Sequence, residues 1–198
     1  MIDFREKMNK YIEDEVRVTK GLDLEKINEA INAIVDCRNR DGIVYTMGNG
    51  GSASTASHFV CDFSKGLSEE VGGKRFIFEC LSDNVATMMA VANDISYDEI
   101  FKYQLEKRLT PNDLIIAISG SGNSKNVIKA VEYARSVGTK IIGITGYKGG
   151  KLKELADYSM HVDVEDMQIA EDVHMMFDHM MMRVISQVIL EKNQHRTE

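Results

Sequence analysis

The stretch Ile43–Ser52, IVYTMGNGGS, decides the fold of this chain. Its apolar run predicts a buried strand that ends at Met47, and the glycines that follow predict a tight loop leading into a helix. A second stretch, Leu114–Ser124, reads LIIAISGSGNS and repeats the same order of strand, glycine loop and helix. Because strands that alternate with helices form parallel sheets, both loops are expected at the carboxyl edge of one sheet.

The rest of the chain continues this alternation. Strands are predicted at 43–47, 75–78, 114–118, 140–145 and 158–162, and helices at 53–65, 85–91, 97–108 and 126–137. Apolar residues at helical spacing also predict a helical N-terminal arm over 1–41 and a long last helix over about 168–192. We therefore expect a single α/β domain over 1–198, whose core at 42–198 holds a doubly wound, mostly parallel five-stranded sheet.

The composition excludes several classes of function. The 198 residues include 24 basic and 31 acidic side chains, which gives a formal net charge of −7. Nucleic acids and anionic membranes attract proteins with excess Lys and Arg, so neither is an expected partner. The charged N-terminus MIDFREKMNKYIEDEV predicts no signal peptide, no apolar stretch is long enough for a membrane span, and three cysteines without CxxC spacing predict no disulfide framework. We expect a cytoplasmic protein.

The last helix is apolar on more than one face, and methionines crowd its middle between Met175 and Met182. One face can pack on the sheet, and the remainder suggests a contact with another subunit. Ordinary core methionines explain the pattern equally well.

The two glycine loops carry the groups that bind phosphate. Glycines let the backbone approach a ligand, the first turn of a helix offers free N–H groups, and hydroxyls add further donors. The candidate ligand-binding residues are Asn49, Gly50, Gly51 and Ser52 in the first loop and Ser119, Gly120, Ser121 and Ser124 in the second. Helix capping by the serines is the alternative interpretation.

Taken alone, the first loop also fits a dinucleotide site. Gly48, Gly50 and Ala53 satisfy the loose glycine fingerprint, and Glu79 ends the next predicted strand, where a ribose-binding acid is common. The second loop argues against this interpretation, because a turn rich in hydroxyls suits a phosphate monoester better. A Walker A motif is absent from both loops.

A metal site is indicated by residues on two helices. His58 and Asp62 are four residues apart, so they share one face of the helix that leaves the first loop. The last helix contains Glu171, His174, Asp178 and His179 within an otherwise apolar stretch, where unpaired burial would be costly. We expect His174 to be a hydrogen-bonded structural histidine and Asp178 to be solvated or to support a ligand from behind.

Together these motifs resemble the sugar isomerase (SIS) fold family. GNGGS is followed by HF at 58–59, AND at 92–94, ISGSGNSKNV at 118–127 and ITGYKGGKL at 144–152. The combination is most similar to the bacterial phosphoheptose isomerases, which convert sedoheptulose 7-phosphate to D-glycero-D-manno-heptose 7-phosphate. The resemblance covers nearly the whole chain. It implies a homotetramer with sites at subunit interfaces and a divalent metal, Zn²⁺ by expectation, in a cytoplasmic enzyme.

The resemblance also assigns residues. It implies metal ligands at His58, Asp62, Glu171 and His179, with Asn93 and Asp94 on sugar hydroxyls. Glu171 and His179 are separated by about 12 Å along a helix, so one ion reaches both only if the side chains converge or different subunits contribute.

The sequence departs from the family pattern at two of these positions. Asp62 stands where the family has Glu, and Glu171 where it has Gln. An arginine that the family carries just beyond the first metal helix is also missing, with Lys65 as a possible stand-in.

The resulting hypothesis is a metal-dependent aldose–ketose isomerase. A carboxylate, Asp62 or Glu171, serves as base and His179 as acid in enediol proton transfer. The alternatives are an isomerase of another sugar phosphate on this fold and a non-catalytic SIS relative that binds a partner protein, as DnaA-binding regulators do. Retention of His58, Asp62, Glu171 and His179 argues against the non-catalytic alternative.

Overall fold

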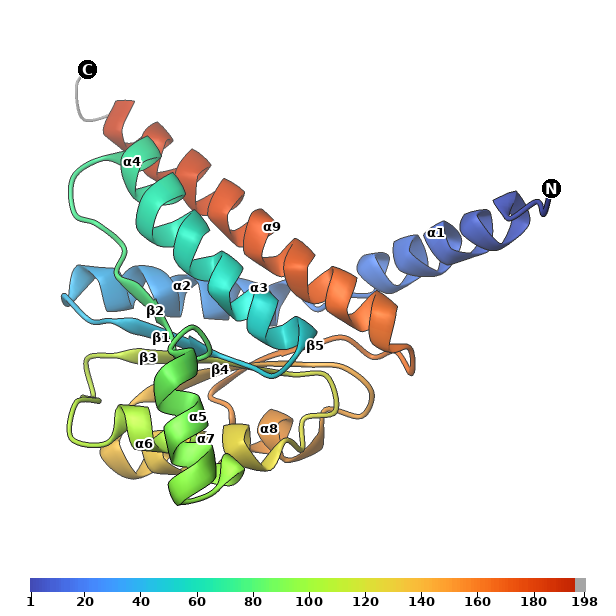
Figure 1. Ribbon diagram of the computed structural model, residues 1–198. Helices are drawn as coiled ribbons and strands as arrows, with labels where there is room; N and C mark the ends of the chain where they lie inside the picture. The colour runs from blue at the N-terminus through green and yellow to red at the C-terminus, as the bar shows by residue number, and fades with distance from the viewer. Residues whose placement is uncertain (195–198) are drawn as a thin grey trace.

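The computed structural model describes residues 1–194 and contains one sheet of five parallel strands (Figure 1). The strands lie in the order β2-β1-β3-β4-β5. The two strands that lead into the glycine loops, β1 and β3, are therefore adjacent. Their bounds are Val44–Met47 for β1, Phe78–Cys80 for β2, Leu114–Ser119 for β3, Lys140–Thr145 for β4 and Tyr158–His161 for β5. The predicted doubly wound parallel fold is confirmed.

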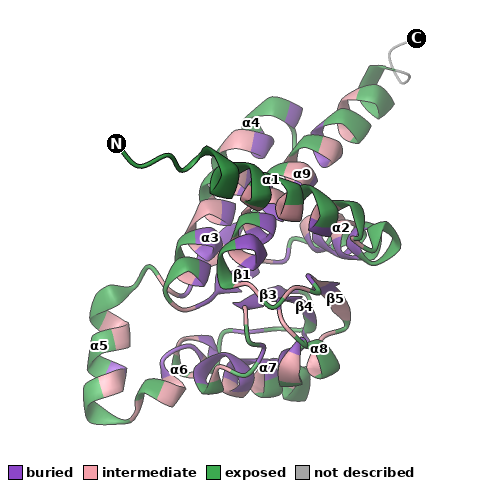
Figure 2. Ribbon diagram, turned by 90° about the vertical axis from the view of Figure 1, so that its right-hand side faces the viewer, coloured by how far each residue is buried: buried purple, intermediate pink, exposed green. Residues whose placement is uncertain are grey.

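Helices cover both faces of the sheet because alternate strand residues point to opposite sides. Ile116 and Ile142 pack under one set of helices, and Ile115 and Ile141 under the other. The first layer comprises α2 (Leu24–Asn39), α3 (Gly51–Val60) and α9 (Met167–Gln194), and the second α5 (Val85–Asp94), α6 (Lys102–Leu105), α7 (Lys125–Val137) and α8 (Gly150–Leu155). Figure 2 shows the strands as the most deeply buried part of the chain.

The α3 helix continues beyond its formal end and runs beside α9. A π-helical segment, Cys61–Leu67, and the short helix α4, Ser68–Val71, extend it in one direction. The Ser68 hydroxyl donates to the Phe63 carbonyl at 2.9 Å and accepts from the Phe76 backbone N–H at 2.9 Å, which ties the widened turn to the chain before β2. A π-turn of this kind is common at functional sites.

The N-terminal helix α1, Arg5–Lys20, projects from the body of the molecule (Figure 1). It is tied to α9 by the Tyr11 hydroxyl, which donates to Asp172 Oδ2 at 2.5 Å, and this bond is the main reason that the pKa of Tyr11 rises to about 12. Most of its apolar side chains remain exposed.

Two predicted elements differ from the observed ones, and one observed helix was not predicted. The second strand begins at Phe78 rather than 75, because the Phe76 N–H is bonded to the Ser68 hydroxyl instead of a neighbouring strand. The helix predicted at 97–108 is divided into a 3₁₀ turn at Tyr97–Glu99 and the short α6. Helix α8 was not predicted, since Gly149 and Gly150 favour a loop. None of the helices in the described part of the chain is long and apolar enough to cross a membrane.

His174 is buried on the inner face of α9, where its ring stacks on Phe177 with centroids 6.4 Å apart. Among residues 1–194, neither ring nitrogen has a hydrogen-bond partner of normal geometry, so the hydrogen bond expected from the sequence is not formed there. Burial lowers the pKa of His174 to about 4, and the backbone of Thr145 opposes this only in part. The residue is therefore a neutral core side chain at neutral pH.

This burial predicts a dependence of stability on pH. Because the folded pKa of His174 is below the value of about 6.5 in the unfolded chain, the unfolded state binds more protons between pH 6.5 and 4. The free energy of unfolding therefore decreases as the pH is lowered through this range, by at most about 1.4 kcal/mol per pH unit from His174. When the free energy of unfolding in urea is measured across this pH range, His174→Phe should lose less stability per pH unit than the wild type. Equal slopes would contradict the assignment.

Candidate active site

Both glycine loops lie at the carboxyl edge of the sheet, side by side. β1 and β3 pair in parallel, and the last residue of β3, Ser119, is in register with Thr145 of β4. The loops enclose a pocket of about 260 Å³. Its lining includes the predicted residues Asn49, Ser52, Ser119, Gly120, Ser121 and Ser124, together with Tyr147, Met167 and Glu171.

The second loop is held in shape by contacts with the segment after β4. Gly122 has φ +67, and a Cβ there would overlap the Gly149 carbonyl, so only glycine fits. Its carbonyl accepts from the Leu152 N–H at 2.9 Å. The hydroxyls of Ser119 and Ser124 lie 3.1 Å apart across the loop. Two hydroxyls thus converge beside the free N–H groups at the start of α7, as a phosphate requires.

The two loops are joined by a pair of amides that the sequence analysis did not identify. Asn49 Nδ2 donates to Asn126 Oδ1 at 3.0 Å, and Asn126 Nδ2 donates back to Asn49 Oδ1 at 2.9 Å. The Tyr97 hydroxyl also donates to Asn49 Oδ1, at 2.7 Å. Asn126 is 2 % exposed. A polar residue at the first turn of a helix gives no signal in sequence of such a long-range partner.

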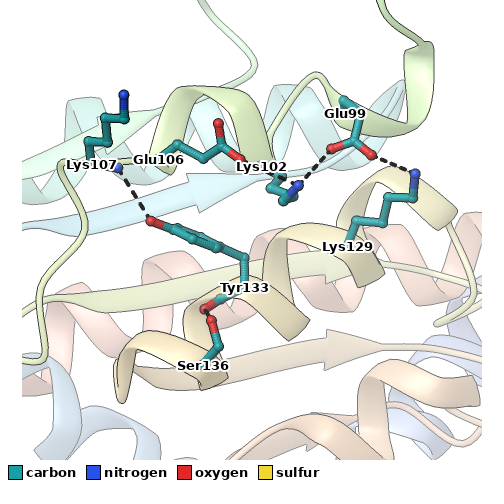
Figure 3. A network of polar contacts seen from close by, with 7 residues as sticks. All are labelled: Glu99, Lys102, Glu106, Lys107, Lys129, Tyr133 and Ser136. Carbon is teal, nitrogen blue, oxygen red and sulfur yellow. Dashed lines mark hydrogen bonds and ion pairs between the residues drawn. The ribbon is translucent and has the colours of Figure 1, made fainter.

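The segment that carries Tyr97 is fastened to α7 by charged side chains (Figure 3). Glu99 accepts from Lys129 at 2.6 Å and from Lys102 at 3.3 Å, and Lys102 also lies 3.3 Å from Glu106. Lysine contacts lower the pKa of Glu99. This network keeps Tyr97 over the first loop, so it supports the pocket without lining it.

Glu171 lies at this loop pocket. Its carboxylate packs so closely on Gly51 that a Cβ at Gly51 would overlap it. Of the four metal ligands implied by the resemblance, Glu171 is the one that the structure places apart from the others. The side chains on α9 do not converge across the two turns between Glu171 and His179.

The other three predicted ligands do come together, between α3 and α9, and Asp178 joins them. His179 Nε2 lies 3.1 Å from His58 Nε2, and the two rings meet edge to face. His58 Nε2 lies 3.5 Å from Asp62 Oδ2 and 3.7 Å from Asp178 Oδ2. One ligand atom from each residue lies within 4.8 Å of all the others.

Asp178 was expected from the sequence to be solvated or to support a metal ligand from behind. The structure does not place it in solvent. Its side chain is fully buried, and neither carboxylate oxygen has a hydrogen-bond partner among the described residues. Burial, and then the nearby charge of Asp62, raise the pKa of Asp178 to about 8. A carboxylate in such a place is costly unless a cation compensates it.

These four residues fit a divalent metal ion. Two imidazoles and two carboxylates are a donor set that zinc and related ions accept. Ligand atoms at 2.0–2.1 Å from a tetrahedral ion would be about 3.3–3.4 Å apart, which is close to the separations around His58 Nε2. Two ring nitrogens that face each other and a buried carboxylate without a partner are both explained by one shared cation.

An open cavity of about 510 Å³ has His58 in its wall. It is lined by Ser54, Ser57, Cys61 and Asp83, and the Ser57 hydroxyl donates to Asp83 Oδ2 at 3.0 Å. Hydroxyls and a carboxylate of this kind are suitable partners for the hydroxyls of a polar ligand.

Asn93 and Asp94 are not brought to the loop pocket. Both are exposed at the end of α5, and Asn93 Nδ2 donates to Asp94 Oδ1 at 2.7 Å. Lys65 is also exposed, with its ammonium 3.4 Å from Glu69. Within one chain, these side chains therefore contact residues that are near them in sequence and do not reach the loop pocket.

Comparison with known proteins follows the same lines as the geometry. Residues 4–146 match the SIS domain family. A probable phosphoheptose isomerase from Thermoplasma volcanium is 36 % identical over 178 residues, which cover 90 % of each chain. The phosphoheptose isomerase of Thermodesulfovibrio yellowstonii is 34 % identical over 193 residues, which cover 96 % of this chain and 95 % of that protein.

Solved structures of similar chains agree. The phosphoheptose isomerase GmhA from Neisseria gonorrhoeae has a TM-score of 0.85 at 25 % identity and matches 93 % of this chain and all of its own. A phosphoheptose isomerase from Francisella tularensis also has a TM-score of 0.85, at 27 % identity, and matches 94 % of this chain and all of its own. The family expected from the motifs is therefore confirmed: the chain belongs to the SIS domain family and, within it, to the phosphoheptose isomerases.

Proposed function

We propose that this protein is a metal-dependent phosphoheptose isomerase that interconverts sedoheptulose 7-phosphate and D-glycero-D-manno-heptose 7-phosphate. The observation that carries the proposal is the placement of two complementary sites along the same helix pair. The loop pocket lies at the start of α3, and the cluster of His58, Asp62, Asp178 and His179 lies farther along it. The names of the relatives support the substrate.

The spacing of the two sites suits a seven-carbon sugar phosphate. Gly51 and His58 are separated by about 10 Å along α3. A phosphate held by Ser119, Ser124 and the loop N–H groups leaves a seven-carbon chain long enough to bring its far carbons to the cluster. The binding energy of the phosphate would then position the reacting carbons.

The same spacing separates the roles of the two candidate bases. Glu171 lies beside the phosphate loop, whereas Asp62 lies within the cluster beside His179. We therefore assign Asp62 as the base that takes a proton from one of the carbons C1 and C2 and returns it to the other. His179 would act as the acid that protonates the oxygen, through Nδ1, the ring nitrogen that does not face His58. Glu171 would accept hydrogen bonds from sugar hydroxyls near the phosphate end.

The cluster would hold the metal ion, with Zn²⁺ as our choice. Asp178 takes the fourth position there in place of Glu171. A divalent cation supplies polarisation of the carbonyl and stabilises charge that develops on its oxygen. His58 and the buried Asp178 would serve only to hold the cation, because neither has a second role in the geometry.

A homotetramer is part of the proposal. Along the projecting helix α1 and its N-cap residue Phe4, the apolar side chains of Phe4, Met8, Ile12 and Val16 recur every four residues and are 47–60 % exposed. Such a stripe favours burial against another subunit. A second subunit is also the means by which Asn93 and Asp94 would meet a substrate. The cytoplasmic location and the use of the product for heptose-containing glycans, in lipopolysaccharide or capsule, stay predictions.

The direct test follows conversion of sedoheptulose 7-phosphate by the purified protein. We expect turnover that is lost in chelator and restored by Zn²⁺, and a decrease in kcat of about 100-fold or more in His179→Ala, the size expected for loss of a general acid. Absence of turnover with every metal tested would contradict the proposal. If only pentose or hexose phosphates were converted, the assigned substrate would be wrong, but the assigned reaction, aldose–ketose isomerisation, would stand.

The role of Asp178 is tested by Asp178→Asn. We expect the free metal concentration that half-saturates the site, measured by elemental analysis after dialysis, to rise about 10- to 100-fold above the wild-type value. In chelator the same variant should unfold at an equal or higher urea concentration, because an unpartnered buried carboxylate has been removed. Glu191→Gln, an exposed change on α9, should alter neither. Unchanged metal binding in Asp178→Asn would exclude it as a ligand.

The phosphate loop is tested by Ser119→Ala and Ser124→Ala. Each removes a hydroxyl from the pocket, so KM for the sugar phosphate should rise several-fold with a smaller change in kcat. Ser136→Ala, which removes an exposed hydroxyl from α7, should leave both constants unchanged. A fall in kcat at constant KM would mean that the loop does not anchor the substrate in its ground state.

A further inference from the structure

A second cavity, of about 420 Å³, lies outside the site described above. It is formed where the turn between α1 and α2, at Gly21 and Leu22, faces β5 and α8. None of its lining residues belongs to the loop pocket or to the metal cluster. Its volume is within the range of small-molecule sites in proteins, about 300–1,000 Å³.

Three cationic side chains line this cavity, in a chain whose net charge is −7. Lys26 and Lys153 make no ion pair with any other residue between 1 and 194. Arg17, itself exposed, pairs within that range only with the half-buried Asp14, at 3.1 Å. The stem of Lys153 lies across Gly149, where a Cβ would overlap it. The three cationic groups thus lie at the cavity without strong partners in the protein, so they are available to bind an anion.

Neutral hydrogen-bonding groups add to the same wall. Ser159 Oγ is buried and has no hydrogen-bond partner among residues 1–194. His161 Nδ1 lies 3.0 Å from Thr145 Oγ1, so the other ring nitrogen is the one left for a ligand. Burial, and then the charge of Lys153, lower the pKa of His161, which favours a neutral ring at neutral pH. A buried hydroxyl without a partner is uncommon unless a ligand or water satisfies it.

Two acids complete the wall and restrict the ligand. Asp23 is occupied as the cap of α2, where its side chain accepts from the Lys26 backbone N–H at 3.2 Å. Asp163 makes no hydrogen bond or ion pair within residues 1–194, so its carboxylate is free to accept from a hydroxyl. With three cations and two acids, the wall favours an anion that also carries hydroxyl groups.

We propose that this cavity binds a small phosphorylated metabolite with free hydroxyls, at a site separate from the catalytic one. Its phosphoryl group is held by Arg17, Lys26 and Lys153 with the Ser159 hydroxyl, and a ligand hydroxyl donates to Asp163. The site is independent of the proposed activity, because it contains none of the groups that carry out the isomerisation.

The test uses the full-length, metal-loaded protein with the catalytic loop disabled by Ser119→Ala/Ser124→Ala. Its Tm is measured against glycerol 3-phosphate and inorganic phosphate at constant ionic strength, since a ligand that binds only the folded state raises Tm with concentration. We expect Tm to rise with ligand concentration, and a given rise to need a lower concentration of glycerol 3-phosphate than of inorganic phosphate. Adding Lys26→Gln/Lys153→Gln should abolish the rise.

Two further variants make the outcome decisive. Lys107→Gln/Lys192→Gln removes the same charge from exposed positions elsewhere and should keep the full rise in Tm. Asp163→Asn should remove only the preference for glycerol 3-phosphate. The proposal is overturned if the Lys26/Lys153 variant, shown by circular dichroism to be folded, keeps the rise, if the control loses it equally, or if the loop variant shows none. Failure of the proposed isomerase activity would leave these results unchanged.

Discussion

The arrangement of this molecule depends on one buried carboxylate. Asp178 is enclosed between α9 and α3, and neither of its oxygens is hydrogen-bonded to any residue in 1–194. His58 lies 3.7 Å away, and the charge of a second carboxylate, Asp62, acts on it. Burial of such a group costs several kcal/mol unless an opposite charge compensates it. A cation shared by these residues removes the cost and links the two helices. The same contact therefore serves both packing and chemistry.

The parallel course of α3 and α9 turns this contact into a site. Each helix approaches the carboxyl edge of the sheet at one end, so Gly51 and Glu171 meet at the loop pocket while His58 and His179 meet two turns later. A ligand that is anionic at one end and reactive at the other matches this order. The net charge of −7 does not oppose such a ligand, because several acids belong to the cation site and the loops offer N–H and hydroxyl groups.

Much of this could be predicted from local sequence. The alternation of strands and helices, the two loops and the His58–Asp62 spacing all depend on residues close together in the chain. Asp178 could not be placed, since its burial depends on which face of α9 meets α3, and a carboxylate in an amphipathic helix is typically exposed. The Asn49–Asn126 pair joins residues 77 positions apart. Glu171 was grouped with the metal by resemblance, whereas its packing on Gly51 places it at the other end of the site.

The most direct test is a crystal structure of the zinc-loaded protein with data collected on both sides of the zinc absorption edge. The account predicts one strong anomalous peak per chain, within bonding distance of His58, Asp62, Asp178 and His179. A peak that is bonded to Glu171 while Asp178 stays outside the coordination shell would contradict it. So would full zinc occupancy at any other position with these four residues left without a metal.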